Sequence, residues 1–417
     1  MKILIVTRHL PWPLDSGGNT AQFALLEYLR KNHEFTMIVE IFPPESYAAV
    51  AELQSKLPEV KIIPVGKQTL TTNTNDRNLV KQSLQSSKEL AKSLLNFLKI
   101  PAYPFKSLPL EMVKIVGNQV QKESYDLIQV EFTETMSIVN VLPKTVKKVF
   151  VNHQIHYKYV ERQLETLRGY PTSYKFLLNY FLKIVKTQEL AFIEQYDAVI
   201  TFSEGDQKLL LKELPQLHTY VSPFPIILPQ INQQALGKFQ NKLVYLGGEK
   251  HYPNKDAVEW FLTEIWSEIY REQPDIIVYI IGKWSPQTIA KYASLKNVIF
   301  TGFIPSLLEV FTGAIMIVPL RIGSGIRTKI LDAMANGLPV VSTPIGCEGL
   351  SVTDQENIMI ADQKSSFINA IFNLVENFEL RERVSKNGLE FVTSTYSQCV
   401  AGETRNDLYK SIVKSET

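Results

Sequence analysis

Two closely spaced glycines and two basic side chains mark residues 323–329, which read Gly-Ser-Gly-Ile-Arg-Thr-Lys. The apolar run 315–319 just before them predicts a strand, and the apolar spacing over 326–336 predicts a helix. Gly323 and Gly325 let the backbone approach a ligand closely, and the free N–H groups of the first helical turn would face that ligand. The segment therefore predicts a phosphate-binding loop.

Side chains at the start of this helix would add charge to the loop. Arg327 supplies a planar fork of donors and Lys329 a point charge. Asp332 follows one turn later on the same side, where a carboxylate that only accepts hydrogen bonds suits sugar hydroxyls. The alternative is an ordinary helix whose Lys329 and Asp332 form a surface pair.

A second glycine pair, Gly17 and Gly18, lies between the first predicted strand, 2–7, and a helix predicted over 20–31. A doubly wound sheet places its ligand crevice at this point, so these glycines too could offer backbone donors to a phosphate. A long connecting loop without function is the alternative. The length of the loop and its Trp12 favour a functional role.

Other phosphate and metal chemistries lack their motifs. Thr328 replaces the last glycine of the dinucleotide fingerprint, and neither a P-loop motif nor an Asp-X-Asp pair occurs. Cys347 and Cys399 form no CxxC pair and no metal-ligand cluster, which fits a reducing compartment. The net charge of +2 argues against nucleic-acid binding. We therefore expect neither a metal nor a cofactor.

Short β-branched runs alternate with amphipathic segments along the chain, which predicts the α/β class with two doubly wound parallel sheets. Strands of the first half are expected at 2–7, 35–42, 61–65, 127–130, 148–152 and 198–202, with helices at 20–31 and 46–57. Strands of the second half are expected at 242–248, 276–282, 297–301, 314–319 and 339–342, with helices at 256–270 and 326–336 and a helical tail over 365–417. The proline-rich stretch 215–229 reads as a linker, which puts a domain boundary near residue 230.

Several segments resemble the C-terminal half of family 4 glycosyltransferases, also called glycosyltransferase group 1. They occur in the family's order and are 245–261, 280–282, 301–304, 318–335 with its Gly-Ser-Gly-Ile-Arg-Thr-Lys loop, 337–349 and 356–358. The N-terminal half matches more loosely, through Gly17-Gly18, the strand leading to His153, and 197–206.

The resemblance implies a GT-B fold of two Rossmann-like domains, with an acceptor domain over 1–230, a nucleotide-sugar domain over 231–395, and a C-terminal helix over 396–417 that crosses back. It implies a retaining, metal-independent hexosyltransferase-like enzyme of class EC 2.4. The donor would be a nucleotide-diphosphate sugar and the acceptor a glycan, a lipid-linked molecule or another hydroxyl compound, as in polysaccharide biosynthesis.

The resemblance also assigns roles to residues of the second half. Asp332 matches the second acid of the family's Glu-X7-Glu motif, which holds the ribose, whereas the first acid is replaced by Ser324. Arg327 and Lys329 would clamp the diphosphate. The remaining predicted donor contacts are Gly17, Gly18, Gly282, Phe303, Ile304, Gly323, Ser324, Gly325 and Ile326. The pair 303–304 would contact the base, and an apolar core turn is the alternative for this pair.

His153 follows a predicted strand where related sequences carry a histidine at the cleft edge, so it would orient the donor sugar or the acceptor hydroxyl. A strand-end histidine without function is the alternative, and the role of His156 stays open. A nucleotide-sugar epimerase of the same fold and a non-catalytic nucleotide-sugar-binding protein are the competing functions. The Ser324 and Asp332 substitutions motivate the second of these.

The sequence also bears on location. Residues 2–7 read as a strand directly after Met1, without a signal-peptide cleavage site, and prolines interrupt the uncharged stretch 214–237. We therefore expect a soluble cytoplasmic protein. Lysines among Leu and Phe over 79–100 predict a basic amphipathic helix, which could make peripheral contact with the inner face of the membrane. An ordinary surface helix with a solvated lysine face is favoured.

Overall fold

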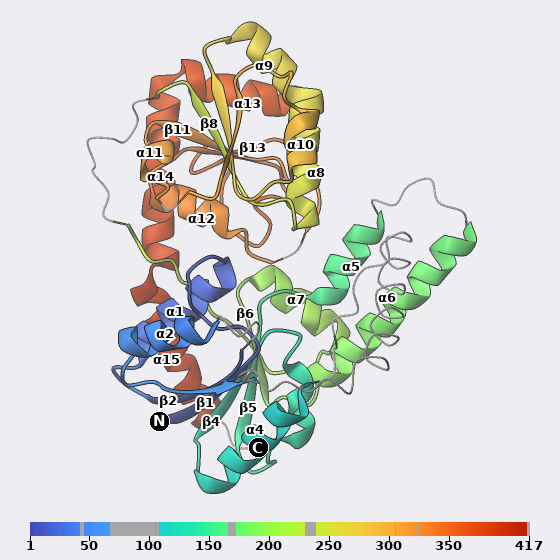
Figure 1. Ribbon diagram of the computed structural model, residues 1–417, viewed down its shortest axis with the longest axis vertical. Helices are drawn as coiled ribbons and strands as arrows, with labels where there is room; N and C mark the ends of the chain where they lie inside the picture. Colours follow the sequence, from blue (N-terminus) through green and yellow to red (C-terminus); the bar gives the residue numbers. More distant parts are fainter. Residues whose placement is uncertain are drawn as a thin grey trace, which may run out of the picture.

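The chain folds around two parallel β-sheets, one in each half (Figure 1). The structure is a computed structural model and describes residues 1–41, 46–66, 105, 108–165, 172–229, 239–304, 306–323 and 325–414. Strands run in the order β3-β2-β1-β4-β5-β6-β7 in the first sheet and β10-β9-β8-β11-β12-β13 in the second. In both sheets the order reverses beside the first strand, which is the doubly wound topology that the alternating pattern predicted.

The first sheet is covered on both faces, so its strands are almost continuously apolar. Its strands are β1 Lys2–Thr7, β2 Glu34–Glu40, β3 Lys61–Val65, β4 Leu127–Glu131, β5 Lys147–Asn152, β6 Ala198–Thr201 and β7 Thr219–Val221. Its helices are α1 Gly17–Leu29, α2 Ser46–Lys56, α4 Leu110–Lys122, η1 Met136–Val141, α5 His156–Glu165, α6 Thr172–Ile193 and α7 Glu204–Glu213. Ile3 and Ile5 face the side of α1 and α2, and Leu4 and Val6 face the side of α4 and α6.

The second sheet is built in the same way. Its strands are β8 Lys242–Leu246, β9 Ile277–Ile281, β10 Val298–Gly302, β11 Ala314–Val318, β12 Val340–Ser342 and β13 Met359–Ile360. Its helices are α8 Tyr252–Trp260, η3 Phe261–Ile265, α9 Trp266–Glu272, α10 Pro286–Lys291, α11 Leu308–Phe311, α12 Thr328–Ala335 and α13 Lys364–Glu376. A π-helical turn, η3, interrupts the single helix predicted over 256–270.

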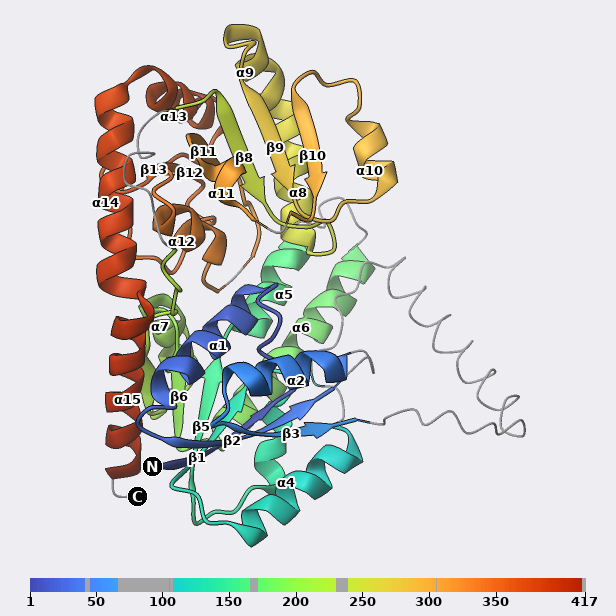
Figure 2. The same ribbon diagram turned by 60° about the vertical axis from the view of Figure 1, so that its left-hand side comes forward.

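Two long helices connect the halves. α14, Phe378–Tyr396, lies along the second domain, and α15, Gln398–Lys414, continues it down the first domain (Figure 2). The junction between them pairs with the chain segment leaving the first domain, because Ile226 N donates to Tyr396 O at 2.7 Å and Gln398 N donates to Ile226 O at 3.0 Å. The two crossings between the domains are therefore hydrogen-bonded to each other.

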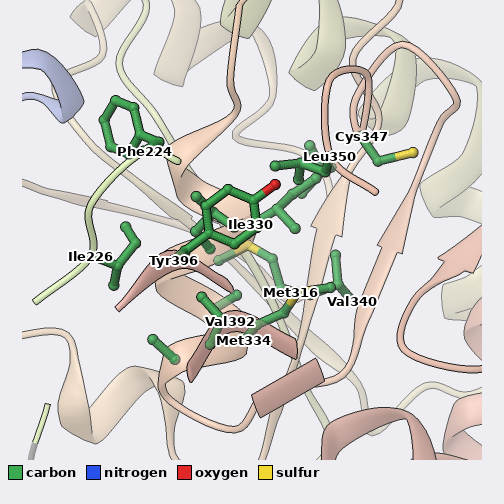
Figure 3. Close-up of a cluster of buried hydrophobic side chains, with 14 of the residues drawn as sticks. Phe224, Ile226, Met316, Ile330, Met334, Val340, Cys347, Leu350, Val392 and Tyr396 are labelled. Atoms are coloured by element: carbon green, nitrogen blue, oxygen red, sulfur yellow. The ribbon is translucent and has the colours of Figure 1, made fainter. Parts of the chain in front are cut away.

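The buried face of α12 fixes the helix that follows the glycine loop. Ile330 and Met334 are fully buried, and burying such side chains contributes about 1.5–3 kcal/mol each. Figure 3 shows them in a cluster drawn from the second sheet, α14 and the segment leaving the first domain, whose other labelled members are Phe224, Ile226, Met316, Val340, Cys347, Leu350, Val392 and Tyr396. The start of α12 is thus held rigidly at the domain boundary.

Two local predictions were wrong. Gly17 and Gly18 do not precede the helix but form its first turn, with Ser16 as the N-cap. The proline-rich stretch 215–229 is not all linker, since β7 within it forms the last strand of the first sheet. Residue 230, the predicted boundary, and the basic segment 79–100 lie outside the described residues.

Candidate functional site

Two helix starts from different domains meet at the domain boundary. A Cβ added to Gly17, the first residue of α1, would lie 2.5 Å from Cγ2 of Thr328, the first residue of α12. The Ser16 side chain caps α1 by accepting from Asn19 N at 3.2 Å, whereas Arg327, the N-cap of α12, makes no side-chain cap. Positive ends of two helix dipoles, with first-turn N–H groups, therefore converge here.

The glycine loop before α12 reaches across to the first domain. Gly323 and Gly325 have φ of 132° and 78°, which strongly favours glycine. A Cβ on Gly325 would lie only 3.0 Å from His153 O, so the loop touches the end of β5. Arg327 folds back on this loop and donates from Nη1 to Gly325 O at 2.8 Å. Ser324, predicted to replace the first acid, lies outside the described residues.

Lys329 points to the end of β8 and not to Asp332. Its Nζ donates to Asn254 Oδ1 at 2.9 Å and to Tyr245 Oη at 3.1 Å, and lies 4.3 Å from the centre of the Tyr245 ring. The described residues show no surface pair between Lys329 and Asp332, which was the alternative reading of this helix. Neutral partners hold the ammonium group without neutralising it.

Burial lowers the pKa values of the basic groups of the site. Burial lowers the pKa of Lys329 to about 7, with help from the charge of Arg327. Burial also lowers the pKa of Arg327 to about 10, against the opposing effect of Glu348. The pKa of His251 falls to about 4 through burial and the charges of Lys329 and Arg327. An anion bound here would reverse these shifts, because it stabilises the protonated forms.

Asp332 and Ile326 flank the two cations. Asp332 is half-buried one turn after Lys329, and burial raises its pKa to about 7. A hydroxyl that donates to this carboxylate would favour its ionised form. Ile326 is half-buried and lies against the loop at Gly349, where an added Cβ would be 3.2 Å from Ile326 Cδ1.

His153 lies at the end of β5 and is held on several sides. Its Nε2 lies 2.5 Å from Glu131 Oε2, and its ring stacks on Phe132 at 3.9 Å between centres. Phe202 approaches it edge-on at 5.0 Å. A Cβ on Gly18 would lie 3.0 Å from the Phe132 ring, so the start of α1 reaches this stack. The glycine pair, the glycine loop and His153 are thereby brought together.

The other predicted contacts differ in position. Gly282, with φ of 133°, lets the ends of β8 and β9 approach, since an added Cβ would be 2.7 Å from Gly247 O. Phe303 follows β10 with 67% of its surface exposed, which excludes an apolar core turn there, whereas Ile304 is half-buried.

His156 begins α5, and its backbone N donates to Glu189 at 2.8 Å. Burial lowers the pKa of its ring.

Sequence reasoning missed several residues of this site. Arg162 of α5 binds Glu348 and Gly323 O, so it ties the first domain to the glycine loop. Glu131 ends β4 beside the strand-order reversal, a position that topology alone marks as ligand-facing. No periodicity or motif points to Arg162, because its partners lie more than a hundred residues away.

The described residues contain no group of three or more His, Cys, Asp or Glu side chains that could hold a metal ion. Within the same part of the chain, every helix is too short or too polar to cross a bilayer. Metal independence and location stay predictions.

Two Rossmann-like domains joined by crossing helices define the GT-B fold, as predicted. Residues 240–377 match the family model described as Glycosyl transferases group 1. This match covers the second domain from β8 to α13, including the glycine loop, α12 and Phe303.

Solved structures show the same fold over the whole chain at low identity. TarM from S. aureus superposes with a TM-score of 0.69 at 13% identity, covering 99% of each chain. HepE from Anabaena, solved with UDP-glucose, gives 0.65 at 13% identity, covering 99% of this chain and 100% of that one. Sucrose-phosphate synthase from Thermosynechococcus elongatus gives 0.65 at 16% identity, with 99% and 98% covered.

One curated relative from Klebsiella pneumoniae is named an uncharacterized 44.6 kDa protein in the cps region. It is 28% identical over 184 residues, which are 41% of this chain and 47% of that protein. The alignment therefore spans about half the length of the relative.

Proposed function

We propose that the protein is a glycosyltransferase of the family 4 type, which moves a sugar from a nucleotide-diphosphate sugar to a hydroxyl acceptor. The contact of Gly17 with Thr328 carries the proposal, because it joins two helix starts beside Arg327 and Lys329. Two dipole ends and the side chains of Arg327 and Lys329 make a site for a dianion or trianion. The group 1 family match over 240–377 covers the cationic half of this site.

In this proposal the diphosphate lies between the two helix starts. Arg327 binds it as a fork and Lys329 as a point charge, and N–H groups from the first turns of α1 and α12 add to them. Asp332 accepts from the ribose. Phe303 offers an exposed ring to the base, and Ile304 packs beside it. Gly282 keeps the neighbouring loops close enough to shape this part of the site.

The chemical step is a transfer with retention at the anomeric carbon. The acceptor hydroxyl attacks from the face that the diphosphate leaves, and the departing phosphate takes its proton. Arg327, Lys329 and the backbone donors stabilise the charge that builds on the leaving oxygen, and His153 orients the sugar or the acceptor. Loss of one such preorganised donor costs about 10²- to 10³-fold in rate.

The neighbours suggest the substrates. HepE was solved with UDP-glucose, TarM with UDP, and the Klebsiella relative is named for a cps region. We infer a nucleotide sugar as donor and a glycan or lipid-linked acceptor, in cytoplasmic polysaccharide biosynthesis. The transfer would need neither a metal nor a cofactor. Peripheral contact of the basic segment 79–100 with the membrane is the less favoured alternative to an ordinary surface helix.

The decisive test is incubation with UDP-, GDP- and TDP-sugars chosen by thermal-shift screening, with and without glycan acceptors. Release of nucleoside diphosphate with a lengthened acceptor is the expected result. An epimerised nucleotide sugar without transfer would instead show an epimerase. Binding without turnover of any donor would show a nucleotide-sugar-binding protein, and both outcomes contradict the proposal.

A further inference from the structure

A buried chain of polar side chains runs from the C-terminal helix to His153. Tyr409 Oη lies 2.5 Å from Gln129 Oε1, Gln129 Nε2 lies 2.6 Å from Glu131 Oε1, and Glu131 Oε2 lies 2.5 Å from His153 Nε2. The exposed fractions are 1% for Tyr409 and 3% for both Gln129 and Glu131. Three hydrogen bonds thus cross from α15 through β4 to β5.

The chemistry of the chain fixes the direction of every bond. A carboxylate only accepts, so the amide of Gln129 turns its NH2 group toward Glu131 and its oxygen toward Tyr409. Tyr409 then has to donate. Burial raises the pKa of its hydroxyl, which keeps the proton in place. At the other end Nε2 of His153 carries the proton, which leaves Nδ1 as the nitrogen without a carboxylate partner.

The far end of the chain is anchored by a buried cation. Arg405, one turn before Tyr409 on α15, is fully buried and donates from Nε to Ser222 Oγ at 3.1 Å. Its guanidinium carbon lies 6.0 Å from the ring centre of Tyr409 and 5.9 Å from that of Phe202, the ring that meets His153 edge-on. A positive charge at this end suits a chain that contains the carboxylate of Glu131.

Buried polar chains of this kind are costly unless every member is paired, and then they specify one arrangement. Replacing buried charged groups by well-packed apolar residues is often neutral for stability. The chain instead ends on His153, whose backbone oxygen contacts the glycine loop at Gly325. This placement is better explained by the orientation of His153 than by stability alone.

We propose that Tyr409, Gln129 and Glu131 are positioning residues, which fix the His153 ring with its Nε2–H on Glu131 and its Nδ1 free for substrate. The orientation of His153 is thereby tied to α15, the helix that enters from the second domain. The role in turnover rests on the proposed function, whereas the ring orientation can be measured without any substrate.

The test uses the full chain with ¹⁵N-labelled histidine. Tyr409→Phe removes one hydroxyl and keeps the packing, Gln129→Met breaks the chain one step nearer to His153, and His153→Gln assigns the resonances. Tyr196→Phe is the matched control, because Tyr196 is also buried in the first domain and donates to Met136 O at 2.6 Å, away from this chain.

We expect Nε2-protonated shifts for His153 in the wild type, and shifts moved toward a mixture of tautomers in both chain variants but not in the control. With a turned-over donor, kcat should fall about three- to tenfold in the chain variants while the donor KM changes less than about twofold. Unchanged His153 shifts in both chain variants overturn the inference, even if kcat falls. If the His153 shifts move in the chain variants of a protein that turns over no donor, the positioning inference is supported and only the proposed function is contradicted.

Discussion

The two helix starts at the domain boundary differ in charge. α1 begins with two glycines capped by Ser16 and carries no acidic residue in its first turn or basic residue in its last. α12 begins at Thr328 after Arg327, an N-cap residue that makes no side-chain cap, and carries Lys329 in its first turn. α1 therefore offers backbone donors and close approach, whereas α12 adds formal charge that burial makes costly. The first domain therefore shapes the site, and the second domain supplies its formal charge.

The largest fall in activity is expected from substitution at the charged start of α12. Arg327→Ala should lower kcat about 10²- to 10³-fold, because a buried donor to the leaving diphosphate is lost. Single-turnover sugar transfer measures it. Arg321→Ala is the control, since Arg321 lies in the same segment but pairs with Asp256 at the surface. An equal fall in kcat in both alanine variants would mean that Arg327 matters only to the fold. Arg327→Lys keeps the charge, so its kcat should lie between those of Arg327→Ala and Arg321→Ala.

A smaller fall in activity is expected from substitution at the uncharged start of α1. Gly17→Ala places a methyl group 2.5 Å from Thr328 and must push the helix starts apart. A displacement of about 1 Å can cost up to about 10²-fold in rate, so kcat/KM should fall about 10- to 10²-fold.

Gly117→Ala in α4 is the matched change, because no atom lies within 4 Å of its added Cβ. It should leave activity unchanged and raise helix stability by about 0.5–1 kcal/mol. Full activity of Gly17→Ala would show that the two helix starts do not act together.

The charge of Lys329 should make donor affinity depend on pH. Its pKa of about 7 means that it loses its proton as the pH rises through neutrality, and a bound diphosphate would raise that pKa. Binding therefore takes up a proton above about pH 7, and affinity should weaken by up to about tenfold per pH unit.

Calorimetry in buffers of different ionisation enthalpy measures the proton uptake. Lys329→Met should abolish it, and Asp332→Asn, which removes another group of the site with a pKa near 7, should leave it in place. Proton uptake that persists in Lys329→Met would assign it to another group.

The smallest effect is expected where the first domain touches the charged loop. Arg162→Met breaks the contacts with Glu348 and Gly323 O, but Glu348 is 42% exposed, so the pair is worth little. The donor KM should rise about two- to threefold with kcat unchanged. Lys208→Met, which removes an exposed pair within α7, is the control. A large fall in kcat would mean that Arg162 acts on the chemistry itself.

Local patterns predicted those parts of the molecule that local forces decide. Alternating apolar runs indicated two parallel sheets, and glycine spacing indicated the loop before α12. β7 was missed because Thr219–Val221 is only three residues long among prolines. The start of α1 was placed too late because Gly17 and Gly18 read as a loop, although Ser16 caps them into the helix.

The site itself depends on contacts that no local pattern carries. Tyr409 meets Gln129 across 280 positions of sequence, and Arg162 meets Glu348 across 186. The sequence predicted the charge of Lys329 but not its partners Tyr245 and Asn254. These lie in β8 and α8, far from Lys329 in the sequence. Burial also decides the protonation of Lys329, and burial is a property of the folded domain.

The central claim is that a diphosphate binds between the two helix starts. Calorimetry should compare the nucleoside diphosphate selected by screening with the same nucleoside lacking phosphates, in the wild type and in the double variant Arg327→Ala, Lys329→Met. We predict that the phosphates strengthen binding about 10²-fold or more in the wild type and less than about threefold in the double variant. Equal affinity for nucleoside and diphosphate in the wild type would contradict the account.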